Sequence, residues 1–286
     1  MPEPTVLQAD FDRLAPAYEE HAALEREVCA RLAERSSFSK REPQRILDIG
    51  SRTGVGAELL KRTFKRAQVV GMDISPAMLC LLARKSRFRR PLGAVCGELR
   101  ALPFRDGCAD FVFSNLALHW LPRPAVLFEE VRRVLRTGGM FLFSTLGPSS
   151  LSELRAAGSG GPAALAIPEF ADLLEIGDAL MAAGFSEPVM DMERIVLDYP
   201  SLDALAGEVE AVGTSLLIGG WPEWRRHARA AESAFGPLKS GDRYPLSYEV
   251  LYGTAFGPPE GQPRRTARGD EARISVDSLL KSRRMG

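Results

Sequence analysis

Small and acidic residues follow two short apolar segments in the first quarter of the chain. The first segment carries Asp48 and runs into the glycine-containing loop 50–54, and the second ends on Asp73. Glycine lets a backbone approach a ligand closely, and an acid about 20 residues beyond such a loop can accept both hydroxyls of a ribose. These residues therefore predict a nucleoside-binding site.

The chemistry of the bound nucleoside depends on what surrounds this loop. A dinucleotide such as NAD fits nearly as well on these features alone, but the loop lacks the complete G-x-G-x-x-G pattern that places a pyrophosphate. Asp48 could meet an amino-acid moiety, and Glu98 could approach the adenine amino group. S-adenosylmethionine is therefore the expected cofactor and methyl donor. Its expected contacts are Asp48, Gly50, Ser51, Thr53, Gly54, Asp73, Ile74, Met78, Glu98, Leu99, Asn115 and Leu116.

The elements that would position these residues alternate between apolar strands and amphipathic helices. A helix over 16–37 precedes them. Strands at this spacing with helices between them form a mainly parallel sheet covered on both faces, which binds ligands beyond the carboxyl ends of its strands. The pattern predicts a Rossmann-like, doubly wound α/β sheet of seven strands. The expected strands are 45–50, 68–74, 92–96, 108–115, 140–145, 189–199 and 247–256, and the expected helices between them are 57–65, 75–87, 123–135, 150–157 and 169–183.

Three regions are expected along the chain. Residues 1–40 form an N-terminal helical cap, and residues 41–256 form the sheet domain, with a helical insertion at about 201–240 before the last strand. Residues 257–286 are expected to form a flexible basic tail.

Composition excludes several classes of protein. The chain has 286 residues, with 37 Lys and Arg against 37 Asp and Glu. A net charge of zero argues against a protein that coats nucleic acid, because such proteins need excess basic residues to displace counterions. No apolar run is long enough for a membrane span, and the first residues do not form a secretory signal. We expect a cytoplasmic monomer with no membrane partner and no metal site, since the cysteines and histidines lack metal-ligand spacing.

Several longer runs resemble a known family. They are Phe-Asp-Arg-Leu-Ala-Pro-Ala-Tyr at 11–18, Phe-Ser-Asn-Leu-Ala-Leu at 113–118, Gly-Phe-Ser-Glu-Pro-Val-Met-Asp at 184–191 and Tyr-Glu-Val-Leu-Tyr-Gly at 248–253. The order of loops and strands matches the class I S-adenosylmethionine-dependent methyltransferases. Within that superfamily, the runs resemble the malonyl-acyl-carrier-protein O-methyltransferases of biotin synthesis, from about Phe11 to the tail.

The resemblance implies methylation of the free carboxylate of a malonyl thioester, carried by acyl carrier protein or by coenzyme A. The methyl ester masks the charge so that fatty-acid enzymes can extend the chain toward pimeloyl carrier protein. A carboxylate is already ionised at neutral pH, so the reaction needs no general base. The expected catalytic residues are Tyr18, as a hydroxyl donor, and Arg155, as a bidentate fork for a carboxylate. A packed aromatic ring and a solvated arginine are the structural alternatives for these two residues.

An acidic carrier protein would need a basic surface on this chain. The basic clusters that could provide it are Arg84, Lys85, Arg87, Arg89 and Arg90, then Arg225, Arg226 and Arg229, and finally the arginines of the tail.

The chain also departs from the family pattern. Arg52 replaces the middle glycine of the first loop, so its side chain must either point outward or narrow the methionine end of the site. Such departures leave two alternatives open. One is a diverged paralogue with another acceptor, and the other is an assembly or scaffold role. The likeness also extends to an assembly factor of mitochondrial respiratory complex I, in which this fold is associated with hydroxylation of a protein arginine.

Overall fold

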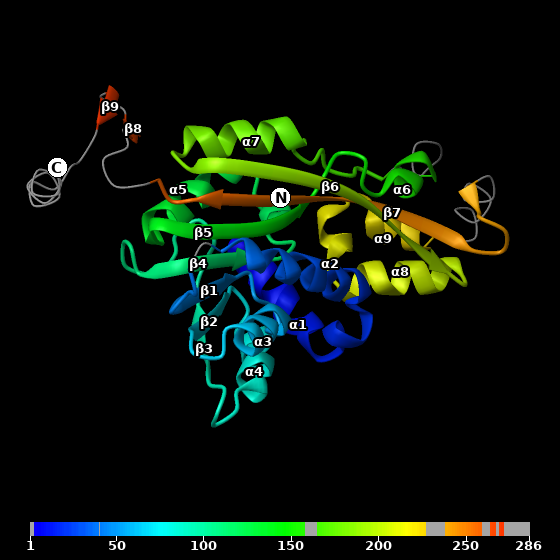
Figure 1. Ribbon diagram of the computed structural model, residues 1–286. Coiled ribbons are helices and arrows are strands. Elements are labelled where there is room, and N and C mark those ends of the chain that lie inside the picture. The colour runs from blue at the N-terminus through cyan, green and yellow to red at the C-terminus, as the bar shows by residue number, and fades with distance from the viewer. Residues whose placement is uncertain are drawn as a thin grey trace, which may run out of the picture.

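A seven-stranded sheet forms the centre of the protein (Figure 1). The computed structural model describes residues 3–39, 41–157, 165–226, 238–258, 264–266 and 269–271. From one edge to the other, the strands are β3 (Leu92–Cys96), β2 (Gln68–Asp73), β1 (Arg45–Ile49), β4 (Ala109–Ser114), β5 (Leu135–Leu146), β7 (Tyr244–Phe256) and β6 (Ser186–Tyr199). The first five are parallel, and β7 runs antiparallel to both β5 and β6. The predicted fold class is confirmed.

The order of the parallel strands reverses between β1 and β4. In an open α/β sheet, the crevice beyond the carboxyl ends at this point is where a ligand binds. The loops after β1, β2 and β4 therefore meet at one edge of the sheet.

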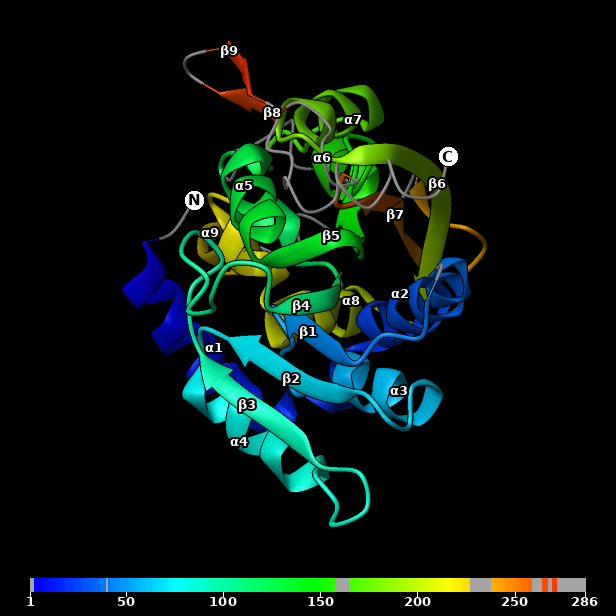
Figure 2. The same ribbon diagram turned by 60° about the vertical axis from the view of Figure 1, so that its left-hand side comes forward.

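Helices cover both faces of the sheet (Figure 2). α2 (Ala23–Glu34), α3 (Val55–Thr63) and α4 (Pro76–Lys85) pack their apolar residues into one core. α5 (Pro124–Val134) and α7 (Leu173–Ala182) pack into a second core on the opposite face. Ser75 fixes the start of α4, because its side chain accepts the N–H of Met78. This cap turns the chain into its helix directly after β2.

The N-terminal helices differ from the single helix predicted over 16–37. α1 (Pro4–His21) begins twelve residues earlier and contains Pro16, and the chain breaks at Ala22 before α2. A proline inside a helix removes a backbone donor and costs about 3 kcal/mol. Phe11, Ala15 and Tyr18 are all buried on one face of α1, and this packing continues the helix through the proline. A 3₁₀ turn, η1 (Arg35–Phe38), follows α2.

Several further boundaries differ from the prediction, among them those of β5 and α7. The strand predicted over 140–145 begins five residues earlier, at Leu135, so that β5 follows α5 directly. α7 begins four residues later than predicted, because Asp172 and Glu175 form a capping box at its N-terminus. α6 (Ser152–Ala157) lies between β5 and α7.

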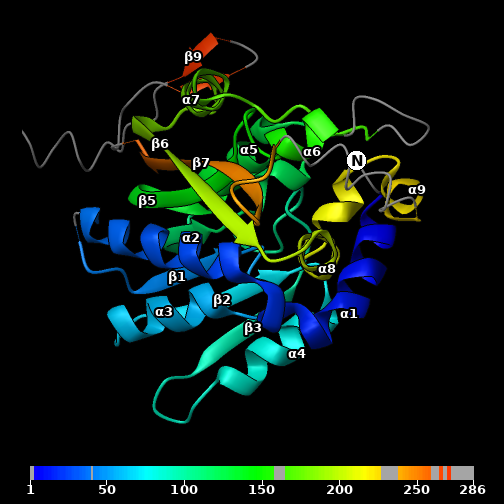
Figure 3. The ribbon, with the colours of Figure 1, turned by 90° about the vertical axis from the view of Figure 1, so that its right-hand side faces the viewer.

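The predicted insertion contains α8 (Leu202–Ala211), the 3₁₀ turn η3 (Thr214–Leu217) and α9 (Trp221–Arg226). α8 packs against α1, and Figure 3 shows both helices beyond one end of the sheet. In the tail, β8 (Arg264–Thr266) pairs with β9 (Gly269–Glu271). Arg229 and the rest of the predicted tail beyond residue 258 lie outside the described residues. Within the described part of the chain, no helix combines the length and the apolar character needed to cross a membrane.

Candidate active site

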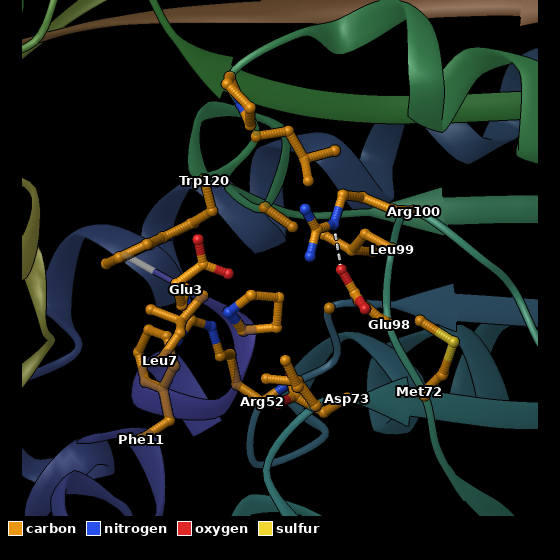
Figure 4. Close-up of a pocket in the computed structure, with 17 residues that line it drawn as sticks. Glu3, Leu7, Phe11, Arg52, Met72, Asp73, Glu98, Leu99, Arg100 and Trp120 are labelled. Carbon is orange, nitrogen blue, oxygen red and sulfur yellow. Dashed lines mark hydrogen bonds and ion pairs between the residues drawn. The ribbon is translucent and has the colours of Figure 1, made fainter. Parts of the chain in front are cut away.

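Two adjoining cavities lie at the carboxyl ends of the parallel strands. The first, of about 360 Å³, is shown in Figure 4 and is lined by the start of α1 and by the loops after β1, β2, β3 and β4. The second, of about 50 Å³, lies between α1, α2, the loop after β1 and the loop after β4. Gly50, Arg52 and Trp120 line both cavities. The two cavities therefore form one site that is divided at these three residues.

The loop after β1 turns sharply at Gly50, where φ is 69°. A Cβ atom added to Gly50 would lie 2.5 Å from the Cβ of Ala117, in the loop after β4. A side chain at this position would both strain the backbone and collide with that loop. The absence of a side chain at Gly50 therefore allows the two loops to lie close together at the boundary between the cavities.

Asp73 anchors the first cavity. It ends β2, and its side chain is buried. One carboxylate oxygen accepts the backbone N–H of Arg52 and the other accepts that of Ser75, both at 2.9 Å. These bonds fix the carboxylate beside the cavity, where an acid can bind ribose hydroxyls. Ile74 and Leu99 supply apolar wall next to it, and Glu98 pairs with Arg100 at the rim.

Two carboxylates in the second cavity carry unsatisfied oxygens. Asp48 Oδ2 and Glu25 Oε2 are buried and have no hydrogen-bond partner. Burial raises the pKa of the Asp48 carboxyl from 3.8 to about 7, against the opposing effect of the Ala57 backbone N–H. Burial likewise raises the pKa of the Glu25 carboxyl from 4.5 to about 7. A cationic group that reached either oxygen would give it a partner and favour the ionised form of that carboxyl.

Aromatic and polar residues complete the second cavity. Tyr18 is buried there, and burial together with the neighbouring charge of Glu25 raises the pKa of its phenol. Burial and the charge of Arg52 lower the pKa of His119 to about 3, so its imidazole is neutral at physiological pH. Asn115 is held by bonds to the Glu25 carbonyl and the Ser144 hydroxyl, both of 2.9 Å. At neutral pH the site thus offers a neutral phenol donor beside two buried carboxyl groups.

Comparison of the sequence with those of known proteins identifies the family of this chain. A family model described as a methyltransferase domain matches residues 47–143. A malonyl-acyl-carrier-protein O-methyltransferase from Laribacter hongkongensis is 40% identical over 270 residues, covering 91% of each chain. One from Halorhodospira halophila is 35% identical over 283 residues, covering 97% of this chain and 96% of the relative. The chain belongs to the malonyl-acyl-carrier-protein O-methyltransferase family.

Solved structures agree at the level of the fold. The YcgJ protein of Bacillus subtilis superposes with a TM-score of 0.57 at 16% identity, covering 81% of this chain and 99% of that one. The phosphoethanolamine N-methyltransferase 2 of Haemonchus contortus, solved with S-adenosyl-L-methionine, superposes with a TM-score of 0.52 at 19% identity. That match covers 86% of this chain and 57% of that one. The fold of this methyltransferase is therefore the Rossmann-like one of its superfamily.

Most of the predicted cofactor residues line the two cavities of this methyltransferase. Gly54 and Met78 line neither cavity. Gly54 precedes α3 with a φ of 83° and packs against Leu82, and Met78 is fully buried in the core. The first cavity is lined by Gly50, Asp73, Ile74, Glu98 and Leu99, and the second by Asp48, Gly50, Ser51, Thr53, Asn115 and Leu116.

The two predicted catalytic residues lie in different surroundings. Tyr18 lines the second cavity, whereas Arg155 lines neither cavity. The Arg155 guanidinium donates to the carbonyl oxygens of Ile167 and Pro168, both at 3.1 Å. The structure thus brings Tyr18 to the site and places Arg155 on a neighbouring backbone segment.

Sequence reasoning missed Glu25 and left the direction of Arg52 open. Glu25 stands on the buried side of α2 beside Leu24 and Val28, and a charge on an otherwise apolar helix face was the available signal. Arg52 points inward, because its side chain lines both cavities and its guanidinium lies over Phe11. The outward alternative for Arg52 is therefore wrong.

Proposed function

We propose that this protein transfers a methyl group from S-adenosylmethionine to the free carboxylate of a malonyl thioester of acyl carrier protein or coenzyme A. The product would be the methyl ester that begins pimeloyl synthesis for biotin. The family membership supports this acceptor, since both relatives compared above are named for it. One observation carries the proposal. In a methyltransferase fold, two buried carboxylate oxygens without hydrogen-bond partners, Asp48 Oδ2 and Glu25 Oε2, accompany Asp73, the acid expected to bind a ribose.

The lining of the two cavities fits the methyl donor. Asp73 would hold the ribose hydroxyls, and Ile74 and Leu99 would enclose the adenine in the first cavity. Asp48 and Glu25 would hold the α-ammonium group in the second cavity. When bound, the donor supplies an electrophilic methyl group on a positively charged sulfur.

The protein's own residues would orient the acceptor and exclude water. The phenol of Tyr18 remains protonated at neutral pH and can donate a hydrogen bond to the acceptor carboxylate. Phe11 and Trp120 pack edge to face with ring centroids 5.1 Å apart, and both line the cavities. In such a site, alignment of the acceptor oxygen with the methyl carbon accounts for much of the rate enhancement.

The transfer removes two charges from the reacting groups. A bond forms between a carboxylate oxygen and the methyl carbon while the bond from that carbon to sulfur breaks. The carboxylate becomes a neutral ester, and the sulfonium becomes a neutral thioether. Charges are costly to hold away from water, so burial of the reacting groups favours the products. No proton moves, which agrees with a site whose carboxyl groups are needed for binding.

The predicted basic clusters lie at different distances from the cavities. α4 begins beside the site at Ser75, and its ten residues carry the chain about 15 Å away before Arg87, Arg89 and Arg90. α9 lies near the start of α1 in Figures 2 and 3, and the start of α1 lines the first cavity. Among the described residues, the ion pair of its exposed Arg226 is with Glu223 of the same helix. We therefore propose that an acidic carrier docks on the side of α9.

The test is intact-mass measurement of malonyl acyl carrier protein after incubation with the purified enzyme and S-adenosylmethionine. The expected result is a mass gain of one methyl group in place of a hydrogen on the malonyl carrier. Acetyl carrier protein, which lacks the free carboxylate, is the matched control and should remain unmodified. An unmodified malonyl carrier under conditions where the enzyme binds S-adenosylhomocysteine would reject this acceptor.

A further inference from the structure

The side chain of Arg52 occupies the boundary between the two cavities. Arg52 is one of three residues that line both cavities. Figure 4 shows the side chain running from the loop after β1 toward Phe11 and Trp120. A charged group at this boundary faces both the adenosine half and the methionine half of the proposed donor site.

The backbone of the loop holds Arg52 in an unfavourable conformation. Its φ is 51°, in the left-handed region, and its N–H donates to Asp73 Oδ2 at 2.9 Å. For a residue other than glycine, this conformation costs about 1 to 2 kcal/mol. A strained residue that lines a site is an indication of function, because the surrounding structure must hold it there.

Aromatic rings surround the guanidinium of Arg52. Its central carbon lies 3.7 Å from the ring centroid of Phe11, 5.3 Å from that of Trp120 and 5.7 Å from that of Tyr18. Each ring face attracts a cation and limits its movement. The planar group is therefore kept in place within an apolar wall.

One nitrogen of this guanidinium has no hydrogen-bond partner. Nη1 is buried without a hydrogen-bond partner, and none of the ion pairs found among the described residues involves Arg52. A buried charged donor without a partner is costly, and a guanidinium matches a carboxylate with two parallel hydrogen bonds. Glu25 lies near enough for the charge of Arg52 to lower the pKa of its carboxyl, but Nη1 makes no hydrogen bond to it. A carboxylate ligand would supply the missing partner.

We propose that Arg52 is the carboxylate-binding residue of this active site, and that it selects the malonyl acceptor. This inference rests on the proposed function, which brings two carboxylates into the site: that of the acceptor and the α-carboxylate of the methyl donor. The role differs from the one predicted for Arg155, whose guanidinium is occupied by the carbonyls of Ile167 and Pro168. An acceptor carboxylate next to Arg52 would lie between two cations, the guanidinium and the sulfonium, and both would attract it.

The test compares the wild-type enzyme with Arg52→Gln, Arg52→Gly and a control, Arg13→Gln. Glycine tolerates the φ of 51°, so Arg52→Gly should fold even if Arg52→Gln does not. Arg13 lies on the exposed side of α1 and pairs with Asp10. Two quantities are measured: the affinity for S-adenosylhomocysteine by calorimetry, and the KM for the malonyl thioester by ester formation.

The two measurements separate the two carboxylates. Loss of a charged hydrogen bond predicts a change of about tenfold or more in the affected quantity, with the other quantity changed by less than about threefold. A raised KM with normal S-adenosylhomocysteine affinity assigns Arg52 to the acceptor, which is the expected result. Weaker S-adenosylhomocysteine binding assigns it to the α-carboxylate of the donor and overturns its role in acceptor selection.

Two other results would overturn the inference as a whole. In the first, neither quantity changes. In the second, S-adenosylhomocysteine binds more tightly to the variants while KM is unchanged, which would mean that the side chain only obstructs the site. If the wild-type enzyme forms no malonyl ester, the proposed function fails. The binding measurement would then still decide whether Arg52 contacts the carboxylate of the donor.

Discussion

Replacing the buried acid Asp48 should stabilise the free protein while weakening its binding of the methyl donor. Asp48 is 1% exposed, and its Oδ2 has no hydrogen-bond partner. Its pKa rises from 3.8 to about 7 in the folded protein. Ionising this group at neutral pH therefore opposes folding.

The magnitude follows from the shift in pKa. A rise of about three units corresponds to roughly 4 kcal/mol of unfolding free energy, because one unit is worth about 1.4 kcal/mol. Below pH 3.8 the carboxyl is protonated in both states, and the penalty is absent. Between pH 3.8 and 7 the folded state holds a proton that the unfolded state has lost, so stability falls as pH rises. Above about pH 7 the full penalty is present.

Urea unfolding of the ligand-free wild type and Asp48→Asn at pH 4, 6 and 8 measures this effect. We expect the variant to gain little at pH 4 and up to about 4 kcal/mol at pH 8. Asp106→Asn is the matched control, because Asp106 is 81% exposed and its pair with Arg133 should contribute less than about 1 kcal/mol.

The same variant should bind S-adenosylhomocysteine about tenfold more weakly or worse, since the α-ammonium group loses a charged partner. A gain in unfolding free energy together with a loss of S-adenosylhomocysteine affinity would indicate that Asp48 serves binding at the expense of stability. An Asp48→Asn protein that is less stable than wild type at pH 8, or that keeps its full affinity for S-adenosylhomocysteine, would refute the reasoning.

Three further variants test other parts of the site. Gly50→Ala places a methyl group 2.5 Å from a neighbouring alanine side chain and should lower the unfolding free energy by about 2 kcal/mol or more. The control is Gly107→Ala, because Gly107 also has a positive φ but has no atom within 4 Å of an added Cβ; this change should lower the unfolding free energy by about 1 kcal/mol. Equal losses of unfolding free energy for the two variants in urea would contradict the steric account. Tyr18→Phe should lower kcat/KM for the malonyl thioester about tenfold and leave S-adenosylhomocysteine affinity nearly unchanged. An unchanged kcat/KM would reduce the phenol to a packing role. Arg226→Glu should raise the KM for the carrier-bound acceptor severalfold but leave the KM for malonyl coenzyme A unchanged. The control Arg89→Glu should change neither KM. The reverse pattern would place the carrier at the far end of α4.

The sheet could be predicted from the sequence because its signals are local. The strand over Leu92–Cys96 agrees with the prediction at both ends, and β1 and β2 each differ from their predicted ranges by only one residue. Parallel strands buried on both faces are continuous apolar runs, and turn residues mark where they end. Placing such strands in one sheet also places their terminal residues at one edge, so most of the expected donor contacts line the cavities.

The remaining features depend on contacts between distant parts of the chain. The start of α1 and its passage through Pro16 follow from packing against elements far along the sequence. The inward direction of Arg52 depends on Phe11 and Trp120, which local pattern cannot bring together. The same holds for Arg155, whose partners lie more than ten residues away in an irregular segment. Tertiary contacts decide these cases against local preference.

The most direct test of the central claim is the position of the transferred methyl group. Malonyl acyl carrier protein is incubated with the enzyme and S-adenosylmethionine that carries a labelled methyl group, and the isolated carrier is then treated with mild base. A carboxyl methyl ester releases the label as methanol, and this account predicts that release from malonyl carrier but not from acetyl carrier. Label that stays on the carrier after base treatment, or that transfers equally to acetyl carrier, would contradict methylation of the free carboxylate.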